Sequence, residues 1–277
     1  MNEEQFALID VDKTKCRRDG ICAAVCPLGL IVNGPDGPVA VAAAAQQCIE
    51  CGHCVAICPA GALSLRSVKA SDCQPIPDGW RLSPEVVEPF LKARRSIRTY
   101  QSRPVDRGTL GRVIDFARYA PSGVNRQPVR WLVVQEREEV RRLAGIVVDW
   151  MRGAVRDNPA LAGRFGLGRL VAGWDAGRDP VCRNAPNLIV AYASSQDPIA
   201  PGACMIALSH LEIAALPFGL GTCWAGYVMM AASQSPAVAA ALDLPAGQAI
   251  FGAMMIGYPR FDYHRIPPRR PADIRWC

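Results

Sequence analysis

The sequence predicts an α+β protein built from two domains, and three observations support this prediction. Two cysteine-rich runs near the N-terminus coincide when the chain is moved by 32 positions, which indicates a small module made of two copies of one unit. Residues 71–83 then carry prolines, a glycine and aspartates, as linkers do. Downstream, helical and strand patterns interleave without the regular alternation of a doubly wound sheet. We therefore place one domain at 1–70 and a second at 84–277.

Composition and charge argue against two classes of protein, those that bind nucleic acids and those that lie in membranes. The chain has 277 residues, of which 50% are hydrophobic, enough to fill two cores. The net charge is +6, but the 31 basic and 25 acidic residues are dispersed, so we expect no nucleic-acid partner. The N-terminal residues lack the basic and apolar regions of a signal peptide, and no apolar stretch approaches the length of a membrane span. We expect a cytoplasmic protein with no membrane partner.

The two cysteine runs have the spacing of iron–sulfur ligands. The second run reads Cys48-x2-Cys51-x2-Cys54-x3-Cys58-Pro, which resembles the cluster motif of bacterial ferredoxins. In such repeats three cysteines of a run bind one cluster and the fourth binds the other. One predicted 4Fe-4S centre therefore has the ligands Cys26, Cys48, Cys51 and Cys54.

The first run differs from the second at one ligand position. Asp19 stands where the register calls for a cysteine, so the second centre has Cys16, Cys22 and Cys58 with Asp19 at the fourth corner. Because a carboxylate is a harder ligand than a thiolate, three outcomes are open. Asp19 binds the fourth iron, that iron is exposed to water, or the iron is missing and the centre is 3Fe-4S.

Zinc sites and disulfide frameworks also use Cys-x2-Cys pairs. Seven cysteines in two matching runs, each ending in Cys-Pro, argue against both alternatives. Five further cysteines lie outside the runs, and in a reducing compartment we expect them to be free thiols. They are Cys73, Cys182, Cys204, Cys223 and Cys277.

Each copy of the N-terminal module is expected to contain a short strand, a cluster loop, a helix opened by the Cys-Pro pair and a second short strand. The turn residues of 33–38 separate the copies, and residues 60–66 form the closing strand of the second copy.

Helices of the second domain follow from caps and apolar spacing. Ser83 followed by Pro84 predicts a helix that runs to about Ala93. Asp106 caps another helix, in which apolar residues recur at helical spacing up to residue 117. Residues 201–216 are apolar nearly all round, which predicts a buried central helix with His210 in the core.

Strands of the second domain are predicted from short apolar runs rich in β-branched residues. These runs are 129–134, 187–193 and 249–257. The tail from Tyr258 onward is rich in proline and arginine and carries no regular pattern.

A cluster of arginines at the end of the first predicted helix suits an anion. Arg94, Arg95 and Arg98, with Ser96 between them, place planar donors that bind phosphate oxygens in pairs. Taken alone, a solvated basic helix end would be the better explanation.

Three further segments accompany the arginines: Ala120–Pro128 with Pro-Ser-x-x-Asn, Gly219–Tyr227, and Ile256–Pro259, followed by Arg269-Arg270. In this order they resemble the nitroreductase family of FMN enzymes, from about Ser83 to the C-terminus. With the cysteine runs in front, the chain is similar to ferredoxin-nitroreductase fusions. The alternative of a dinucleotide loop at Gly219-x-Gly221 fails, because the next glycine is Gly226.

The resemblance implies an α+β homodimer with FMN at the subunit interface. Arg94, Arg95 and Ser96 would hold the phosphate and ribityl chain, and Arg98 would approach the pyrimidine end of the flavin. The backbone of the Ala225-Gly226 pair would face the flavin N5 and O4, although some family members carry Glu in place of Ala225. The remaining contacts would be Pro121, Ser122, Asn125 and Gln127 from the partner protomer, and Arg269 with Arg270 at the phosphate.

No other catalytic constellation is present, because His53, His210 and His264 lie apart in the sequence and form no metal triad. We therefore expect an oxidoreductase in which electrons pass from the clusters to FMN and on to a nitroaromatic, a quinone or an activated double bond. NAD(P)H or an external donor protein would supply the electrons. The rival hypothesis is an electron-transfer protein that relays electrons to a protein partner and has no small substrate.

Overall fold

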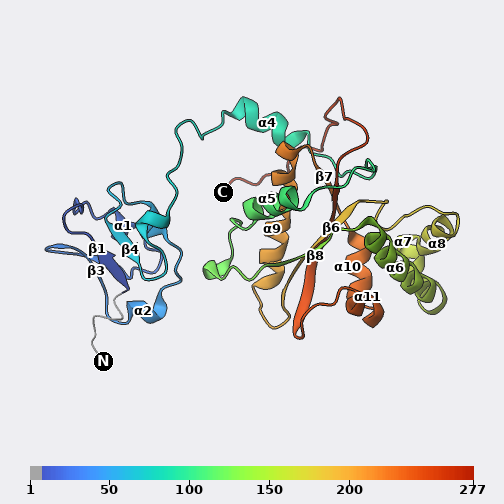
Figure 1. Cartoon of the computed structure of the whole chain (residues 1–277), viewed down its shortest axis with the longest axis horizontal. Helices are drawn as coiled ribbons and strands as arrows, with labels where there is room; N and C mark the ends of the chain where they lie inside the picture. The colour runs from blue at the N-terminus through green and yellow to red at the C-terminus, as the bar shows by residue number, and fades with distance from the viewer. Residues whose placement is uncertain (1–7) are drawn as a thin grey trace. The chain divides into compact units, whose positions relative to one another are not determined.

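The computed structural model describes residues 8–277, which divide into two compact units. The boundary falls between Leu82 and Ser83, and residues 124–126 group with the N-terminal unit. Between the strand that ends at Leu65 and the helix that begins at Pro84, the only element is a short 3-10 helix, η2 (Ala70–Asp72). Each unit is described below by itself (Figure 1).

The N-terminal unit consists of two small antiparallel sheets and three one-turn helices. Strand β1 (Ile9–Val11) pairs with β4 (Leu63–Leu65), and β2 (Ile31–Gly34) pairs with β3 (Gly37–Ala40). The expected turn at 33–38 is therefore shorter than predicted, because residues 35–36 connect a hairpin in which residues 33–34 pair with residues 37–38. The helices are α1 (Ile21–Ala24), α2 (Ala44–Gln47) and α3 (His53–Ala56).

The expectation that a helix follows each Cys-Pro pair is wrong. Helices α1 and α3 lie before Cys26-Pro27 and Cys58-Pro59, not after them. Pro27 suits a first helical position, but Gly29 has φ 63°, and Gly61 likewise has φ 57° after Pro59. A left-handed residue ends a helix, so no second turn can form.

The C-terminal unit is built on a four-stranded antiparallel sheet with the strand order β5-β6-β8-β7. These strands are β5 (Arg130–Val134), β6 (Asn187–Ser194), β7 (Gly221–Trp224) and β8 (Gln248–Gly257). Three of them match predicted strands, whereas β7 lies in a segment that we had treated only as a motif. The antiparallel sheet with helices on both faces confirms the α+β class.

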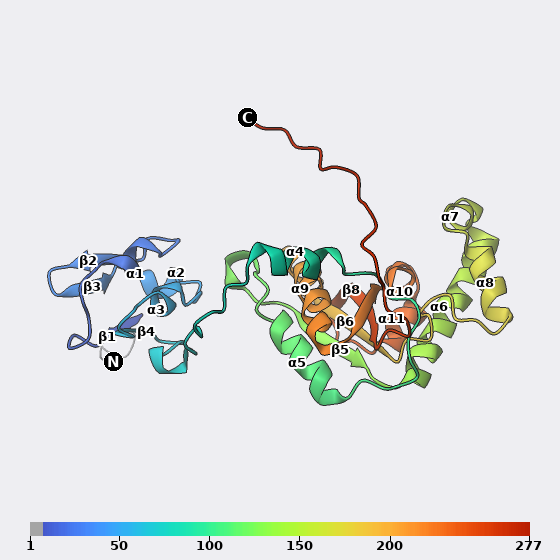
Figure 2. The ribbon, with the colours of Figure 1, turned by 90° about the horizontal axis from the view of Figure 1, so that it is seen from above.

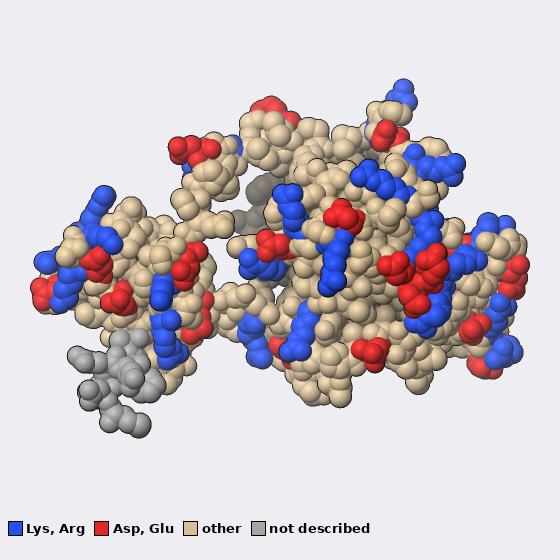
Figure 3. All heavy atoms as spheres, in the orientation of Figure 1, with Lys and Arg blue, Asp and Glu red and all other residues tan. Residues whose placement is uncertain are grey.

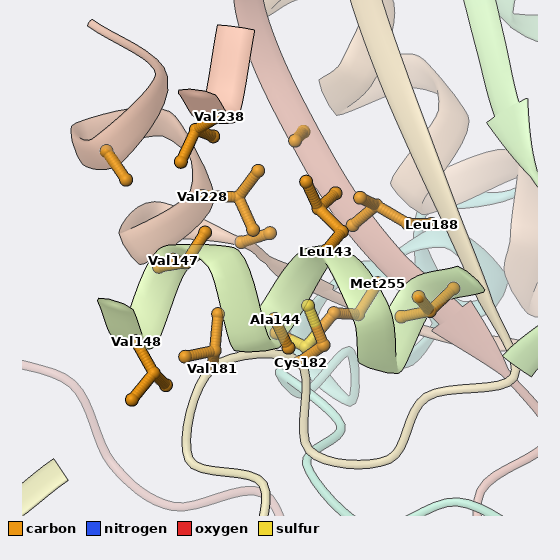
Figure 4. Packing of buried hydrophobic residues seen from close by; sticks show 14 of the residues in the cluster. Leu143, Ala144, Val147, Val148, Val181, Cys182, Leu188, Val228, Val238 and Met255 are labelled. Atoms are coloured by element: carbon orange, nitrogen blue, oxygen red, sulfur yellow. The ribbon is translucent and has the colours of Figure 1, made fainter. Parts of the chain in front are cut away.

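Side chains that alternate along the strands build a separate core on each face of the sheet. On one face, Leu188 and Val190 of β6 pack with helix α6 (Arg137–Asp157), as Figure 4 shows for Leu188. The other helices on this side are α7 (Pro159–Phe165), α8 (Leu167–Asp175), α10 (Gly226–Ala232) and α11 (Pro236–Ala241). On the opposite face, Ile189 and Ala191 pack with α5 (Arg107–Ala117) and α9 (Ala200–Ala215).

Helix α9 is less buried than its composition predicts. Its face toward the sheet includes Leu208 and Leu211, but Met205 and Ile206 are exposed. His210 is exposed as well, and its ring hydrogen-bonds to the carbonyl of Ile206, so its placement in the core was wrong. Polarity is a poor guide here, because the exposed side of the helix is nearly as apolar as the buried side.

Among residues 8–277, the segment Ala200–Phe218 alone has the length and apolarity that a membrane-crossing helix would need. The expectation that no apolar stretch approaches this length is therefore wrong. The core helix of a folded domain meets the same criteria, and α9 packs against β6, β8 and α5.

The first helix of the C-terminal unit, α4 (Pro84–Lys92), matches its prediction, and the Asp106 carboxylate caps α5 by accepting from the Thr109 amide at 2.8 Å. The tail after Tyr258 has no helix or strand beyond a bridge between Tyr100 and Pro259, and it extends away from the sheet (Figure 2). On the face shown in Figure 3, basic and acidic side chains are interspersed.

Candidate functional site

The structure brings the cysteines together in the crossed pattern that the repeat predicts. One cavity is lined by Cys26 of the first run and by Cys48, Cys51 and Cys54 of the second. A separate cavity is lined by Cys16, Asp19 and Cys22 of the first run and by Cys58 of the second. In each cavity the last cysteine of one run completes the set of the other.

Glycines in left-handed conformation begin the one-turn helices that carry two of these cysteines. Gly20 has φ 75° before α1, and Gly52 has φ 72° before α3. A Cβ on Gly20 would lie 2.6 Å from Asn33 Nδ2, so this position excludes a side chain. Cys22 and Cys54 are held on these helices with their side chains buried.

Backbone amides are directed at the cysteine sulfurs in both runs. Leu30 N lies 3.3 Å from Cys26 Sγ, and Ala62 N lies 3.3 Å from Cys58 Sγ at the same spacing in the second run. Glu50 N adds a third contact, 3.4 Å from Cys48 Sγ. Such donors stabilise negative charge on sulfur, which suits thiolate ligands.

Burial disfavours the thiolate form of Cys54 and Cys22, the two buried cysteines among those that line these cavities. It raises the pKa of Cys54 to about 11, and nearby Cys51 and Cys26 add to the shift. Burial also raises the pKa of Cys22, with contributions from Cys58 and Asp19. These thiols are protonated at neutral pH, so binding of iron must release protons.

The arrangement fits a cluster better than a single ion. Within the described residues, 8–277, no three His, Cys, Asp or Glu side chains gather closely enough to hold one metal ion. A zinc site requires four ligands at about 2.0–2.3 Å from one ion. A cluster spreads its irons, so its ligands stand further apart around a shared space.

Asp19 lines the cavity of Cys16, Cys22 and Cys58, but its side chain remains exposed to solvent. Its Oδ1 accepts a hydrogen bond from the Ile21 amide at 3.3 Å. The side chain is at the position of the missing cysteine, and a harder oxygen donor is available there.

The arginine segment of the C-terminal unit is held against β7. Ile97 N donates to Thr222 O at 2.8 Å. Arg94 Nη1 forms an ion pair with Glu212 Oε1 of α9 at 3.1 Å, and Arg95 lies over the Tyr263 ring at 5.8 Å. Both arginines line a cavity of about 470 Å³. Arg94 therefore already has an anionic partner, whereas Arg95 has only an aromatic one among the described ion pairs and ring contacts.

Arg98 and Gly226 line a second cavity of about 370 Å³. Ala225 N donates to Ala253 O at 2.9 Å, so its amide is already used within the sheet. Gly226 opens α10, where helix amides have no acceptor within the helix, and a Cβ there would meet open space. Of the predicted pair, Gly226 rather than Ala225 is the residue whose backbone a planar ring could approach.

The Pro-Ser-x-x-Asn segment lies elsewhere in the protomer. Pro121, Ser122 and Gln127 line a third cavity of about 140 Å³ that shares no lining residue with the other two. Ser122 Oγ accepts from Gln127 N at 2.9 Å. Asn125 belongs to the N-terminal unit by its contacts, where its amide donates to the carbonyls of Ile49 and Glu50 at 3.2 and 3.0 Å.

The predicted flavin contacts therefore fall into separate groups within one protomer. Arg269 and Arg270 form a further group in the exposed tail. Ser96 lies between the arginines, and burial raises the pKa of the nearby Cys223 thiol. Within the described residues, no one cavity brings all of these predicted contacts together.

One charged residue in the wall of the 370 Å³ cavity was not predicted from the sequence. Arg183, in the loop before β6, lines the cavity together with Arg98. In the sequence of this loop, Asp179 stands among other polar residues, Arg178, Arg183 and Asn184, so nothing set it apart. Such a residue becomes informative only when its burial is known.

Comparison with known proteins follows the division into units. Residues 91–258 match the nitroreductase family, and residues 14–63 match the 4Fe-4S dicluster domain. A relative from Methanothermobacter thermautotrophicus, provisionally named NADH dehydrogenase/NAD(P)H nitroreductase, is 26% identical over 61% of this chain and 75% of its own length.

Two solved structures share the fold of the C-terminal unit. A nitroreductase from Desulfitobacterium hafniense with bound FMN has a TM-score of 0.56 and 21% identity, covering 71% of this chain and 100% of its own. A nitroreductase from Bacteroides fragilis with bound FMN has a TM-score of 0.55 and 20% identity, covering 70% and 100%. At this identity they establish the fold alone.

Proposed function

Because the chain belongs to the nitroreductase family and carries a 4Fe-4S dicluster domain, we propose that it reduces a small organic acceptor with electrons drawn through its own clusters. It is an FMN-dependent iron–sulfur oxidoreductase. The acceptor class that we propose comprises nitroaromatics, quinones and activated double bonds. The observation that carries the proposal is the crossed gathering of cysteines in one unit, next in sequence to a flavin-type fold.

The two cysteine cavities supply the ligand sets that we propose for the clusters. Cys26, Cys48, Cys51 and Cys54 would hold an all-thiolate 4Fe-4S centre, and two described backbone amides reach the sulfurs of this set. Cys16, Cys22 and Cys58 would hold the second centre, with Asp19 at its fourth corner. Only one described amide, that of Ala62, reaches a sulfur of the second set. Fewer amide donors lower a cluster potential, and a carboxylate in place of a thiolate changes it as well, so we expect the two centres to have different potentials.

The residues of the C-terminal unit fit an FMN. Arg95 offers its guanidinium to the phosphate, since Arg94 is engaged with Glu212. Arg98 offers positive charge, and the Gly226 amide a donor, at the wall of the 370 Å³ cavity. When bound, the flavin accepts electrons singly and passes them on in pairs, and the protein stabilises its reduced form.

We further propose a homodimer with the flavin at its interface. The support is the separation of the predicted contacts, because Pro121, Ser122 and Gln127 share no cavity with Arg98 and Gly226 in one protomer. The exposed apolar side chains Met205 and Ile206 of α9 provide a surface that a second copy would cover.

The electron donor is proposed to be NAD(P)H or a separate donor protein. The provisional name of the archaeal relative favours NAD(P)H for that protein. The clusters give this chain a second entrance for electrons.

A competing proposal is a relay that passes electrons to a protein partner and has no small substrate. To separate the two, the holoprotein is reduced with dithionite without oxygen and then mixed rapidly with nitroaromatics and quinones. The enzyme proposal predicts that the absorbance of the flavin and of the clusters returns to the oxidised level. If both stay reduced until a protein partner is added, the relay is correct.

Arg95→Ala is expected to lower the FMN content of the purified protein, because a phosphate would lose a charged donor worth about 1.5–3 kcal/mol, or roughly tenfold or more in affinity. Flavin content per chain, measured by absorbance after denaturation, checks this. Lys92→Ala is the control, because its charge lies at the exposed end of α4, where it pairs with Glu88. An unchanged flavin content in Arg95→Ala would remove the phosphate assignment.

Asp19→Cys is expected to convert the second centre to ligation by four thiolates. Electron paramagnetic resonance of the reduced protein should then show two similar centres where the natural chain shows two different ones. Asp12→Asn is a control, because its carboxylate pairs with Lys15 outside the cavity. Identical spectra before and after the Asp19 change would mean that this residue is not at the cluster.

A further inference from the structure

The loop between α8 and β6 is fixed by a buried carboxylate. Asp179 is 5% exposed. Its Oδ1 accepts from the amides of Val181 and Cys182 at 3.0 and 2.9 Å, and its Oδ2 accepts from the amide of Asn184 at 2.9 Å. Charge-assisted bonds to three successive parts of one turn hold its backbone in a single shape.

The backbone of Arg183, within this loop, has a strained conformation. Its φ is 58°, and that of Asn184 is 53°. An arginine in the left-handed region is uncommon and persists where the surroundings impose it. Those surroundings are the core below, since Val181 and Cys182 point into the cluster of Leu143 and its neighbours on α6 (Figure 4). Arg183 and Asn184 are therefore exposed between anchored residues on either side, Cys182 and Ala185, which are buried.

The side chain of Arg183 lines the same cavity of about 370 Å³ as Arg98 and Gly226. Phe165, Tyr227 and Met230 provide much of the remaining wall. A cavity of this size, with aromatic side chains and a few placed polar groups in its wall, is typical of small-molecule sites. Within residues 8–277 neither Arg98 nor Arg183 has a carboxylate in ion-pair distance.

Arg98 and Arg183 line the same cavity as Cys223. Burial raises the pKa of the Cys223 thiol. The guanidinium groups of Arg98 and Arg183, which line the same cavity, lower the pKa of this thiol, and the Glu212 carboxylate raises it. The cavity thus carries two positive charges, and the proposed flavin site uses only that of Arg98.

We propose that Arg183 binds the carboxylate of the acceptor, and that the acceptor is an aromatic or conjugated acid. A guanidinium matches a carboxylate with two parallel hydrogen bonds, and aromatic walls favour a flat apolar body behind that group. The proposal rests on the proposed function, because it places the acceptor beside the flavin. The negative pyrimidine end of a reduced flavin is the other source of anionic charge, and the test separates the two.

The test compares 4-nitrobenzoate with its uncharged methyl ester. Each is titrated into the oxidised holoprotein by calorimetry, which requires no turnover. The natural chain should bind the acid at least about 10-fold more tightly than the ester, and Arg183→Gln should abolish that preference. Arg183→Lys should retain part of it. Arg178→Gln is the matched control, because Arg178 is an exposed arginine in the same connection that does not line the cavity.

Three results would overturn the proposal: equal binding of acid and ester to the natural chain, an intact preference in Arg183→Gln, or an Arg178→Gln variant that loses the preference equally. If Arg183→Gln keeps the preference but loses FMN, the residue is a flavin contact instead. The proposed function is tested separately, by mixing the dithionite-reduced protein with acceptors. That function would be refuted if the protein passed electrons to none of them.

Discussion

Replacing Cys26 with alanine is expected to remove the centre of the second cysteine run, not that of its own run. The structure groups Cys26 with the cavity of Cys48, Cys51 and Cys54, and it groups Cys58 with that of Cys16. Cys26→Ala should therefore abolish the all-thiolate centre and leave the centre that contains Asp19. Cys58→Ala should do the reverse.

The effect should be large, because metal binding contributes directly to the folding of a small unit. The N-terminal unit has a small core of its own, in which Cys22 and Cys54 are themselves buried members. Loss of one centre should also lower the thermal stability of this unit.

Iron and sulfide analysis should give about half of the natural content in each variant, and electron paramagnetic resonance should identify the surviving centre. Cys73→Ala, which changes an exposed thiol outside both cavities, is the control and should leave the iron content and the spectra unchanged. The crossed assignment would be contradicted if Cys26→Ala and Cys16→Ala removed the same centre.

Gly221→Ala is expected to destabilise the C-terminal unit and to release FMN. A Cβ at this position would lie 2.9 Å from Ile97 Cβ and 3.0 Å from Pro259 Cγ, and closer still to Ile97 Cγ1. Neither neighbour can turn aside, because Ile97 is tied to β7 through its amide and proline is rigid. The glycine thus allows the arginine segment to pass directly over the strand.

Overpacking of this kind costs about 1–3 kcal/mol. The segment that must move carries Arg95 and Arg98, so flavin retention should fall together with the melting temperature. Gly111→Ala is the matched control, because its Cβ would meet nothing within 4 Å in the middle of α5. It should be neutral or slightly stabilising. An unchanged melting temperature and flavin content in Gly221→Ala would refute this account of the segment.

The cluster module was readable from the sequence because ligand chemistry fixes spacing. The cysteine spacing indicated cluster loops, and the resemblance to two-cluster ferredoxin repeats implied the crossed ligand sets, in line with the two cavities. The local helices were not readable, since Pro27 permits a helix and the left-handed Gly29 prevents one.

In the C-terminal unit, the sequence did not predict which residues are buried or which distant residues come into contact. The apolar sequence of α9 does not show which side faces the sheet, and so His210 was misplaced. Arg183 was missed because its function depends on a fixed loop, and that loop depends on the burial of Asp179. The ion pair between Arg94 and Glu212 was also not predicted, because the two residues lie 118 positions apart in the sequence.

Electrons are proposed to reach the flavin through the clusters of the same chain. To test this, the oxidised holoprotein is mixed with a limiting amount of reduced methyl viologen, the cluster signals are followed by freeze-quench electron paramagnetic resonance, and the flavin is followed by absorbance. Cluster signals should appear first and decay as the flavin bleaches, at a rate independent of protein concentration. The Cys26→Ala, Cys58→Ala double variant should lack this route. Flavin reduction at the natural rate in that variant would show that electrons do not need the clusters to reach the flavin.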